Sequence, residues 1–365
     1  MSSFLKILYE TYKGKRVLVT GHTGFKGSWL SIWLTELGAE VIGYALDPYT
    51  DRDNFEFSKI SSKIIDIRAD IRDFDKLEET FQKYRPEFIF HLAAQSLVRM
   101  GYISPKETYD TNVGGTVNVL ENCRKSKSVK IVINVTSDKC YENKEWVWGY
   151  RENDSLGGYD PYSSSKGCAE LITAAYRNSF FNPKDFKIHG KALSSVRAGN
   201  IIGGGDWAKD RIIPDCIRAL EKEEPIKIRN PKSIRPWQYV LEPIGGYLLL
   251  GALMFEDPEK YCGAWNFGPE GSSIISVQEL VELVLKYWER GNWEKSKKNK
   301  EPHEAKLLIL DISKAKYELG WKPSMDVKEA VKRTVEWYKA SQTPTAIPDI
   351  CRKEVQNYME KMSIK

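Results

Sequence analysis

The chain has 365 residues, 41% of them apolar and 29% charged, which is enough to bury one large core or two closely packed ones. Its 55 basic and 50 acidic side chains leave a net charge of +5, too weak to support nucleic-acid binding, and its apolar runs are too short to cross a bilayer. Residues 1–16 lack the apolar stretch of a secretory signal, so we expect a cytoplasmic protein without membrane contact. Six scattered cysteines, with no CxxC pair, predict free thiols and no metal site.

From residue 16 onward, short apolar runs alternate with segments of helical periodicity. Strands are predicted over 16–20, 40–45, 64–67, 88–92, 130–136 and 194–198, and helices over 27–37, 74–84, 108–126 and 163–181. This alternation is typical of an α/β protein with a Rossmann-type, doubly wound parallel sheet.

Beyond residue 200 the pattern loosens, and glycine and proline predict irregular segments of the kind that line pockets. We expect a polar loop over 287–306, helices over 312–319 and 327–340, and a peripheral tail over 346–365. The predicted NAD-binding Rossmann domain spans 12–199, and a later segment, about 232–265, returns to it. A smaller, discontinuous substrate-binding domain is expected over 200–231 and 266–345.

A glycine-rich turn, TGHTGFKG over 20–27, lies between the first strand and the first helix. Glycine permits the unusual φ angles of such a turn and the close approach of a pyrophosphate, and the helix N-terminus offers free N–H groups. At this place in a βα unit the pattern predicts a dinucleotide site made by Gly21, Thr23, Gly24, Phe25, Lys26 and Gly27.

The choice between NAD and NADP depends on the end of the second strand. Asp47 follows that strand and could accept from a ribose hydroxyl, and no arginine occupies the strand end, although Arg52 follows shortly. We therefore predict NAD. Asp70 and Ile71, after the third strand, are candidates for contact with the adenine, or else belong to an ordinary loop.

A tyrosine and a lysine four residues apart, Tyr162 and Lys166, fall on one face of a predicted helix. A free tyrosine has a pKa near 10, and a nearby ammonium or nicotinamide cation lowers it. Ser137, at the end of the preceding strand, could donate to the same substrate hydroxyl. The order of glycines, Ser137, Tyr162 and Lys166 predicts oxidation of a substrate hydroxyl by a nicotinamide cofactor.

With these motifs in place, residues 12–340 resemble the extended short-chain dehydrogenase/reductase family, in its nucleotide-sugar-modifying group. The resemblance also covers His91-Leu92-Ala93-Ala94 and Asn112 in TNVGGTVNVL, which implies cofactor contacts at Leu92, Ala93, Ala94 and Asn112. It implies a homodimer as well, formed through the helices Thr108–Ser126 and Ser163–Phe181.

Longer segments, including GHTGFKGSWL, YDPYSSSKGCAEL and RAGNIIGGGDWAKDRIIPD, resemble the branch of 4,6-dehydratases that acts on CDP-glucose. This resemblance implies C4 oxidation, elimination of water across C5 and C6, and hydride return to C6 by retained NAD. Asp138 would be the acid for the 6-hydroxyl group. Lys139 would be either the C5 base or an ammonium that steadies the enolate. A deoxysugar destined for a surface polysaccharide, such as a lipopolysaccharide O-antigen, would be the expected pathway product.

A diphosphate needs fixed cations, and the planar guanidinium of arginine suits it. The candidate substrate-binding residues are Gln95, Ser96, Asn200, Asp206, Trp207, Arg211 and Arg235. An aromatic insertion, Trp146, Trp148 and Tyr150, either walls the sugar or covers the core. The residues themselves name no base, so CDP-glucose depends on the resemblance alone.

Two other classes of function remain open at this point. A 4,6-dehydratase or 4-epimerase acting on another nucleotide sugar would use the same cofactor and the same Tyr162–Lys166 pair, but an epimerase needs no acid and base at 138 and 139. A dinucleotide-sensing regulatory protein could share the fold, although such proteins often lack the tyrosine–lysine pair.

Overall fold

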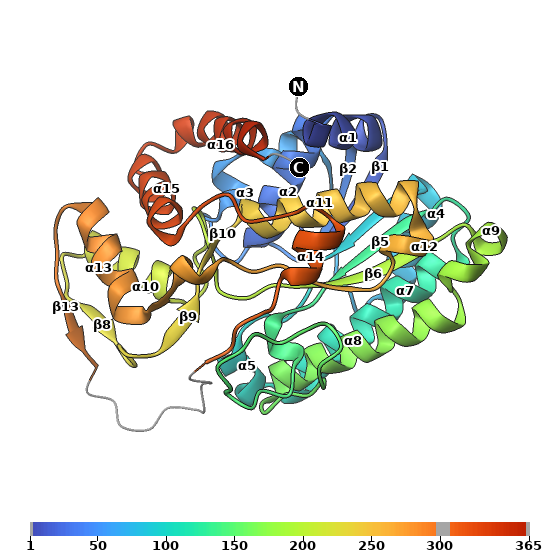
Figure 1. The fold of residues 1–365 in the computed structure, drawn as a ribbon. Coiled ribbons are helices and arrows are strands. Elements are labelled where there is room, and N and C mark those ends of the chain that lie inside the picture. The colour runs from blue at the N-terminus through green and yellow to red at the C-terminus, as the bar shows by residue number, and fades with distance from the viewer. Residues whose placement is uncertain (1–2, 297–306, 363–365) are drawn as a thin grey trace.

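A seven-stranded parallel sheet forms the centre of the molecule (Figure 1). The computed structural model describes residues 3–296 and 307–362. The strand order is β11-β6-β5-β4-β1-β2-β3. These strands are β1 (Arg16–Thr20), β2 (Glu40–Ala45), β3 (Ile65–Arg68), β4 (Phe88–His91), β5 (Ile131–Val135), β6 (Ala192–Arg197) and β11 (Ala264–Asn266). The predicted doubly wound parallel sheet is confirmed.

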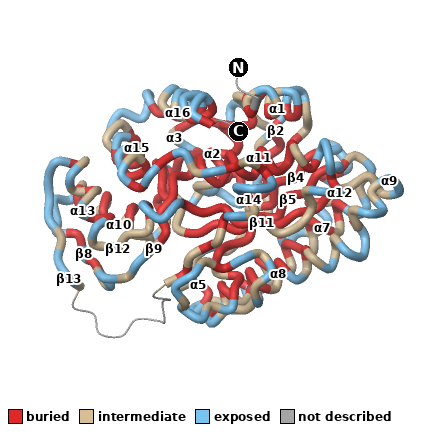
Figure 2. Tube along the Cα trace, viewed as in Figure 1, coloured by how far each residue is buried: buried red, intermediate tan, exposed pale blue. Residues whose placement is uncertain are grey.

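Side chains that alternate along the strands fill two separate cores. Val17 and Val19 of β1 face a layer made by α1 (Ser3–Tyr12), α2 (Phe25–Glu36) and α11 (Leu241–Glu256). Leu18 faces the opposite layer, made by α4 (Phe74–Tyr84), α7 (Gly115–Lys125) and α8 (Pro161–Ser179). Because both faces are covered, the central strands β1, β4, β5 and β6 lie buried in the interior (Figure 2), whereas the edge strand β3 is partly exposed.

The helix predicted over 108–126 is divided into three parts. It begins as α6 (Pro105–Tyr109), widens into a single π-helical turn, η2 (Asp110–Gly114), and continues as α7. π-Helical turns recur at functional sites, because the extra residue redirects the side chains around it. Asn112 lies within this turn.

The second half of the chain builds a smaller lobe beside the sheet (Figure 1). Short strands pair there: β8 (Ile226–Ile228) with β13 (Trp293–Lys295), β9 (Ile234–Pro236) with β12 (Ile274–Ser276), and β10 (Gln238–Tyr239) with β7 (Ile201–Ile202). The longer helices of this half are α10 (Ile212–Glu221), α13 (Val277–Trp288) and α15 (Val327–Ala340). Of the segment about 232–265, which was expected to return to the Rossmann domain, helix α11 packs on the central sheet, whereas strand β9 pairs with β12 in the smaller lobe. The expected domain boundaries stay a prediction.

Short helices and single turns complete the described chain. They are α3 (Asn54–Phe57), η1 (Ile60–Lys63), α5 (Val98–Ile103), η3 (Asp138–Cys140), η4 (Pro183–Asp185), α9 (Phe186–His189), α12 (Pro258–Tyr261), η5 (Gly271–Ser273), α14 (Ser313–Glu318) and η6 (Pro344–Ala346). Across residues 3–296 and 307–362 no helix is long and apolar enough to span a bilayer.

Two sequence-based expectations for the second half need correction. Residues 347–361 are not a peripheral tail but a helix, α16 (Ile347–Lys361), with buried side chains that include Val355 and Tyr358. Helix α16 packs on α2, where the rings of Trp33 and Tyr358 meet edge to face with their centroids 5.4 Å apart. A polar loop was expected over 287–306, but residues 293–295 of this segment form strand β13, which pairs with β8. Residues 297–306 lie outside the described part of the chain.

Candidate active site

The glycine turn after β1 has the shape that a dinucleotide needs. Gly21 has φ +75°, and a Cβ there would lie 2.7 Å from the backbone nitrogen of Ala93. A Cβ on Gly27 would lie 2.0 Å from the carbonyl oxygen of Gly21. Gly24 caps α2 without a side-chain hydrogen bond, so the first N–H groups of this helix remain available to an anion. The turn therefore fits a bound pyrophosphate.

The loop after β4 is held against this turn by buried side chains. Thr20 Oγ1 accepts from the N–H groups of Leu92 and Ala93, each at 3.2 Å. Asn112 accepts from the N–H of Gln95 at 2.8 Å and donates to Ser165 Oγ at 2.9 Å. Leu92, Ala93 and Ala94 thus lie beside the glycine turn, and Asn112 ties their loop to α8.

The strand ends at the far side of the turn carry the residues expected near the adenosine. Thr23 Oγ1 donates to the carbonyl of Leu46 at 2.9 Å, which joins the turn to the end of β2. Asp47 is exposed, and its carboxylate lies 3.5 Å from Arg68 at the end of β3. An arginine is therefore present at this edge, although it also pairs with Asp66 at 2.8 Å.

Asp70 and Ile71 follow β3, as predicted. Asp70 accepts from Arg72, which holds the pKa of this carboxyl below its usual value. Ile71 is buried in the second core, under Gly115. Arg52, the other arginine considered, stacks on Trp207 with its guanidinium carbon 3.8 Å from the ring centroid and pairs with Glu221, so it is engaged away from Asp47.

A cavity of about 870 Å³ opens at the carboxyl ends of β5 and β6, between the sheet and the smaller lobe. Parallel α/β sheets bind their ligands at this edge. Of the residues predicted for the site, eleven line the cavity: Phe25, Lys26, Ser96, Ser137, Asp138, Lys139, Tyr162, Asn200, Asp206, Arg211 and Arg235. Sequence reasoning missed further basic residues of the lining, among them Lys209, Lys227 and Arg229.

The turn after β5 presents three of the predicted catalytic residues. Ser137 Oγ donates to Asp138 Oδ1 at 2.9 Å, and Lys139 Nζ lies 3.5 Å from the same carboxylate oxygen. Asp138 is almost fully buried against Gly199, and its Oδ2 has no hydrogen-bond partner among the described residues. A buried carboxyl with a free oxygen at a cavity wall is suited to proton transfer with a ligand.

Tyr162 and Lys166 lie on α8, one helical turn apart, and both are buried. Burial raises the pKa of Tyr162 to about 12, although a hydrogen bond with Ser137 and the charge of Arg211 lower it. The sequence predicted that Lys166 would lower the pKa of Tyr162, but in the protein without a cofactor burial outweighs the groups that lower this pKa. Burial lowers the pKa of Lys166 to about 8, and its Nζ lies 3.5 Å from the carbonyl of Val135, behind the cavity wall.

Arg211 connects the segment after β7 with the loop after β4. Arg211 donates to Asp206 Oδ2 at 2.8 Å and to Ser96 Oγ at 3.1 Å. Asn200 has φ +37°, and its Nδ2 finds no partner within residues 3–296 and 307–362. Arg211, Asp206, Ser96 and Asn200 are thus brought together where a ligand's phosphates and sugar would lie.

Three aromatic or amide candidates lie elsewhere. Trp207 does not line the cavity, because its ring is buried between Arg52 and Tyr338. The amide of Gln95 accepts from the N–H of Leu97 at 2.6 Å and donates to Thr108 Oγ1 of α6 at 2.9 Å, so Gln95 does not line the cavity. The insertion at 146–150 stacks upon itself and on Tyr141, which favours the covering role over a wall of the cavity.

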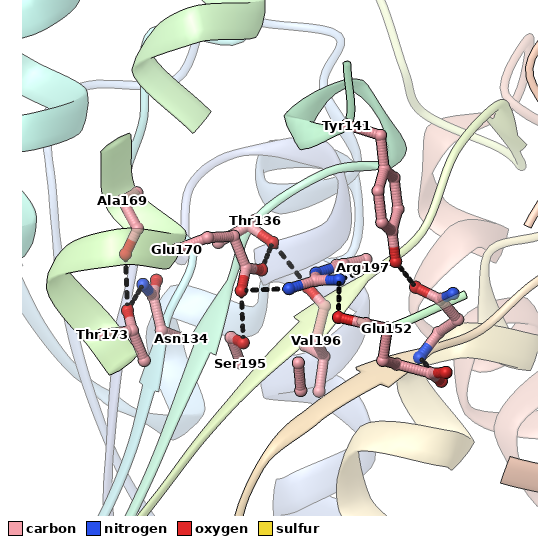
Figure 3. Close-up of polar contacts among 12 residues, drawn as sticks. Asn134, Thr136, Tyr141, Glu152, Ala169, Glu170, Thr173, Ser195, Val196 and Arg197 are labelled. Carbon is pink, nitrogen blue, oxygen red and sulfur yellow. Dashed lines mark hydrogen bonds and ion pairs between the residues drawn. The ribbon is translucent and has the colours of Figure 1, made fainter. Parts of the chain in front are cut away.

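A buried ion pair behind the catalytic turn was not predicted. Glu170 and Arg197 meet at 2.8 Å between α8 and β6 (Figure 3). The spacing of Glu170, four residues after Lys166, placed it on the same helix face, but only the folded chain shows its partner. In the described part of the chain, no three histidine, cysteine, aspartate or glutamate side chains come together as metal ligands.

The fold and the site define a dinucleotide-binding Rossmann protein with a tyrosine–lysine pair at a nucleotide-sized cavity. Residues 18–334 match the family model described as GDP-mannose 4,6 dehydratase, and the chain belongs to this family.

Individual relatives agree with this assignment. The chain is 51% identical, over 95% of its length and 97% of the relative's, to the CDP-glucose 4,6-dehydratase of Salmonella typhimurium. It is 27% identical to a probable dTDP-glucose 4,6-dehydratase of Sinorhizobium fredii, over 88% of this chain and 92% of the relative.

Solved structures share the fold. An epimerase from Methanothermobacter thermautotrophicus covers 96% of this chain and 98% of its own with a TM-score of 0.79 at 22% identity. A dTDP-glucose 4,6-dehydratase from Bacillus anthracis, in complex with NAD, has a TM-score of 0.73 at 21% identity, over 89% of this chain and 97% of its own.

Proposed function

We propose that the chain is a CDP-glucose 4,6-dehydratase, which converts CDP-glucose to CDP-4-keto-6-deoxyglucose with loss of water and no net redox change. The observation that carries the proposal is the meeting of Ser137, Asp138, Lys139 and Tyr162 at one cavity wall. The 51% identity to the Salmonella typhimurium enzyme supports the choice of CDP-glucose as substrate.

The glycine turn supports NAD as the resident cofactor, with Gly21, Gly24 and Gly27 around the pyrophosphate and Asp47 at the ribose. When bound, NAD supplies the hydride acceptor for C4, the hydride donor for C6 and a positive charge near Tyr162. Such a charge would favour the tyrosinate form, against the burial that raises the pKa of Tyr162 to about 12.

Each proton transfer of the proposed reaction is assigned to a different side chain of this chain. Tyr162 takes the proton of the sugar 4-hydroxyl group, and Ser137, which hydrogen-bonds with Tyr162, orients that hydroxyl. Asp138 gives a proton to the departing 6-hydroxyl group. Lys139 either removes the C5 proton or, as an ammonium, stabilises the enolate oxygen.

The two roles of Lys139 can be separated by comparing Lys139→Met with Lys139→Arg. If Lys139 is the base, exchange of the C5 proton with deuterated solvent, read by mass spectrometry, falls about 10²-fold or more. Exchange at the wild-type rate in Lys139→Met would exclude both roles, because methionine removes the base and the ammonium charge together. Lys139→Arg keeps the positive charge but cannot give up its proton near neutral pH, so exchange should be lost in this variant if Lys139 is the base and largely kept if it acts as an ammonium.

The substrate's diphosphate is assigned to Arg211 and Arg235, with Asn200 near the sugar. We further propose that the protein acts as a homodimer in the cytoplasm and feeds deoxysugar synthesis for a surface polysaccharide. The free state of all six cysteines supports a reducing compartment. Exposed apolar side chains on and beside α8, Leu171 and Phe180, support the dimer contact.

The function is tested with purified protein, without added NAD, incubated separately with CDP-glucose, dTDP-glucose, UDP-glucose and GDP-mannose. Loss of one water from CDP-glucose alone, read by mass spectrometry, is the expected result. Water loss from another donor would keep the reaction and overturn the base specificity. Unchanged masses for all four donors, also after NAD is supplied, would overturn the dehydratase and favour a 4-epimerase.

A further inference from the structure

The turn that carries Ser137, Asp138 and Lys139 is attached at both of its ends to one buried ion pair. This pair joins Glu170 of α8 to Arg197 of β6, with Arg197 Nη2 2.8 Å from Glu170 Oε2 (Figure 3). Both side chains are only 3% exposed, so water does not screen their charges.

Glu170 holds the residue just before the turn. Its carboxylate accepts from the hydroxyl of Thr136, whose next residue is Ser137, and from Ser195 Oγ at 2.7 Å. Together with Arg197, these donors satisfy a carboxylate that would otherwise be buried at high free-energy cost. Burial alone would raise the pKa of Glu170, but Arg197 and the two hydroxyl groups lower it below its usual value.

Arg197 holds the residue just after the turn. Its Nη1 donates to the hydroxyl oxygen of Tyr141 at 2.6 Å and to the carbonyl of Glu152 at 3.0 Å. The Tyr141 hydroxyl in turn donates to Asn266 Oδ1 at 2.8 Å, on β11. Residues 137–140 therefore run between two anchors, Thr136 and Tyr141, that end on the same ion pair.

Glu170 also belongs to the helix that carries the other half of the site. It follows Lys166 by one turn and Tyr162 by two, so the three side chains share a face of α8. One carboxylate thus fixes the distance between the strand end with Ser137 and the helix with Tyr162.

We propose that the Glu170–Arg197 pair is a positioning unit, which sets the catalytic turn 137–140 in register with Tyr162 and Lys166. The inference rests on the proposed dehydratase function. The pair touches neither the cavity nor a ligand, since neither residue lines the cavity, and it acts through Thr136 and Tyr141. Misplacement of reacting groups by about 1 Å can lower a rate about 10²-fold.

The pair has an electrostatic consequence at Lys166. The charged or titratable groups that face this ammonium are Glu170 on its own helix, Cys140 in η3, Lys26 in α2 and His91 in β4. Glu170 raises the pKa of Lys166 against the lowering by burial. Removal of the Glu170 charge therefore makes Lys166 lose its proton at a lower pH.

The test compares Glu170→Gln with Thr173→Val. Thr173 lies on the same helix and accepts a buried hydrogen bond from Asn134 of β5 at 2.7 Å, but it does not contact the residues flanking the turn (Figure 3). Glu170→Gln should lower kcat for CDP-glucose dehydration about tenfold or more with KM within about threefold of wild type. Its alkaline limb of kcat should move to lower pH. Thr173→Val should lower Tm but leave kcat and the pH profile unchanged.

Hydrogen exchange supplies a readout that needs no activity. Peptides covering 136–142 should exchange faster in Glu170→Gln than in wild type, and at the wild-type rate in Thr173→Val. If Glu170→Gln does not fold, Thr136→Val and Tyr141→Phe carry the test, because each removes one anchor and leaves the ion pair in place.

The positioning role would be overturned if Thr136→Val and Tyr141→Phe kept the kcat, pH profile and exchange rates of wild type. It would also be overturned if Thr173→Val lowered kcat as much as Glu170→Gln does. A wild-type protein that releases no water from CDP-glucose would overturn the proposed function instead. The exchange measurement would then still decide whether the pair orders residues 137–140.

Discussion

Replacing Glu242 by glutamine is expected to remove a pH dependence from the stability of the fold. Glu242 is fully buried near the start of α11, and its carboxylate accepts from the N–H groups of Ser324 and Met325. It also accepts from the hydroxyl of Tyr358 at 2.7 Å, which attaches α16 to α11. Burial raises the pKa of Glu242 from 4.5 to about 7, although these donors lower it.

The sign and size of the effect follow from proton linkage. Between about pH 4.5 and pH 7 the folded state keeps the proton of Glu242, while the unfolded chain releases it. The contribution of this group to the free energy of unfolding is therefore fully present below pH 4.5 and is lost as the pH rises to about 7. At about 1.4 kcal/mol per pH unit, the loss amounts to about 3 kcal/mol.

The assay is equilibrium urea unfolding of wild type and Glu242→Gln at several pH values from 4.5 to 8, followed by tryptophan fluorescence. The free energy of unfolding of wild type should fall relative to that of Glu242→Gln by about 3 kcal/mol from pH 4.5 to pH 8. Tyr358→Phe is the matched control, because it loses a hydrogen bond to the same carboxyl but keeps the titrating group. A difference that does not change with pH would refute the reasoning and show that the donors keep Glu242 ionised throughout.

Three further predictions concern the cofactor, the reaction and the assembly. Gly27→Ala should be purified with little or no NAD, because the added Cβ would lie 2.0 Å from the carbonyl oxygen of Gly21. Gly114→Ala, where an added Cβ meets open space, should retain NAD. Equal NAD content of the two variants, measured by absorbance, would contradict this prediction. Asp138→Asn should lower kcat for water loss about 10²-fold or more, because an amide cannot give a proton to the 6-hydroxyl, while calorimetry should show CDP-glucose bound as in wild type. Water loss at the wild-type rate would rule out Asp138 as the acid. Leu171→Glu should convert dimers to monomers in sedimentation, whereas glutamate at Ile188, exposed on α9 outside the expected contact, should not; a dimeric Leu171→Glu would move the interface elsewhere.

Local patterns were sufficient for the sheet and for the two halves of the site. Alternation of strand and helix predicted the doubly wound fold, because buried parallel strands are apolar on both faces. The glycine turn is readable from sequence since its φ angles and close contacts exclude side chains whatever surrounds it. Tyr162 and Lys166 are one helical turn apart in any helix, so their shared face needed no tertiary information.

The sequence by itself thus determined the fold class, the glycine turn and the tyrosine–lysine face, all of which depend on neighbours along the chain. Only the tertiary structure decided that Trp207 enters the core, that residues 347–361 pack on α2, and that Glu170 meets Arg197 27 residues away. The sequence can indicate that a buried charge or the apolar face of a helix requires a partner. The identity of that partner depends on which elements lie next to each other in the folded protein, and this is a property of the tertiary structure.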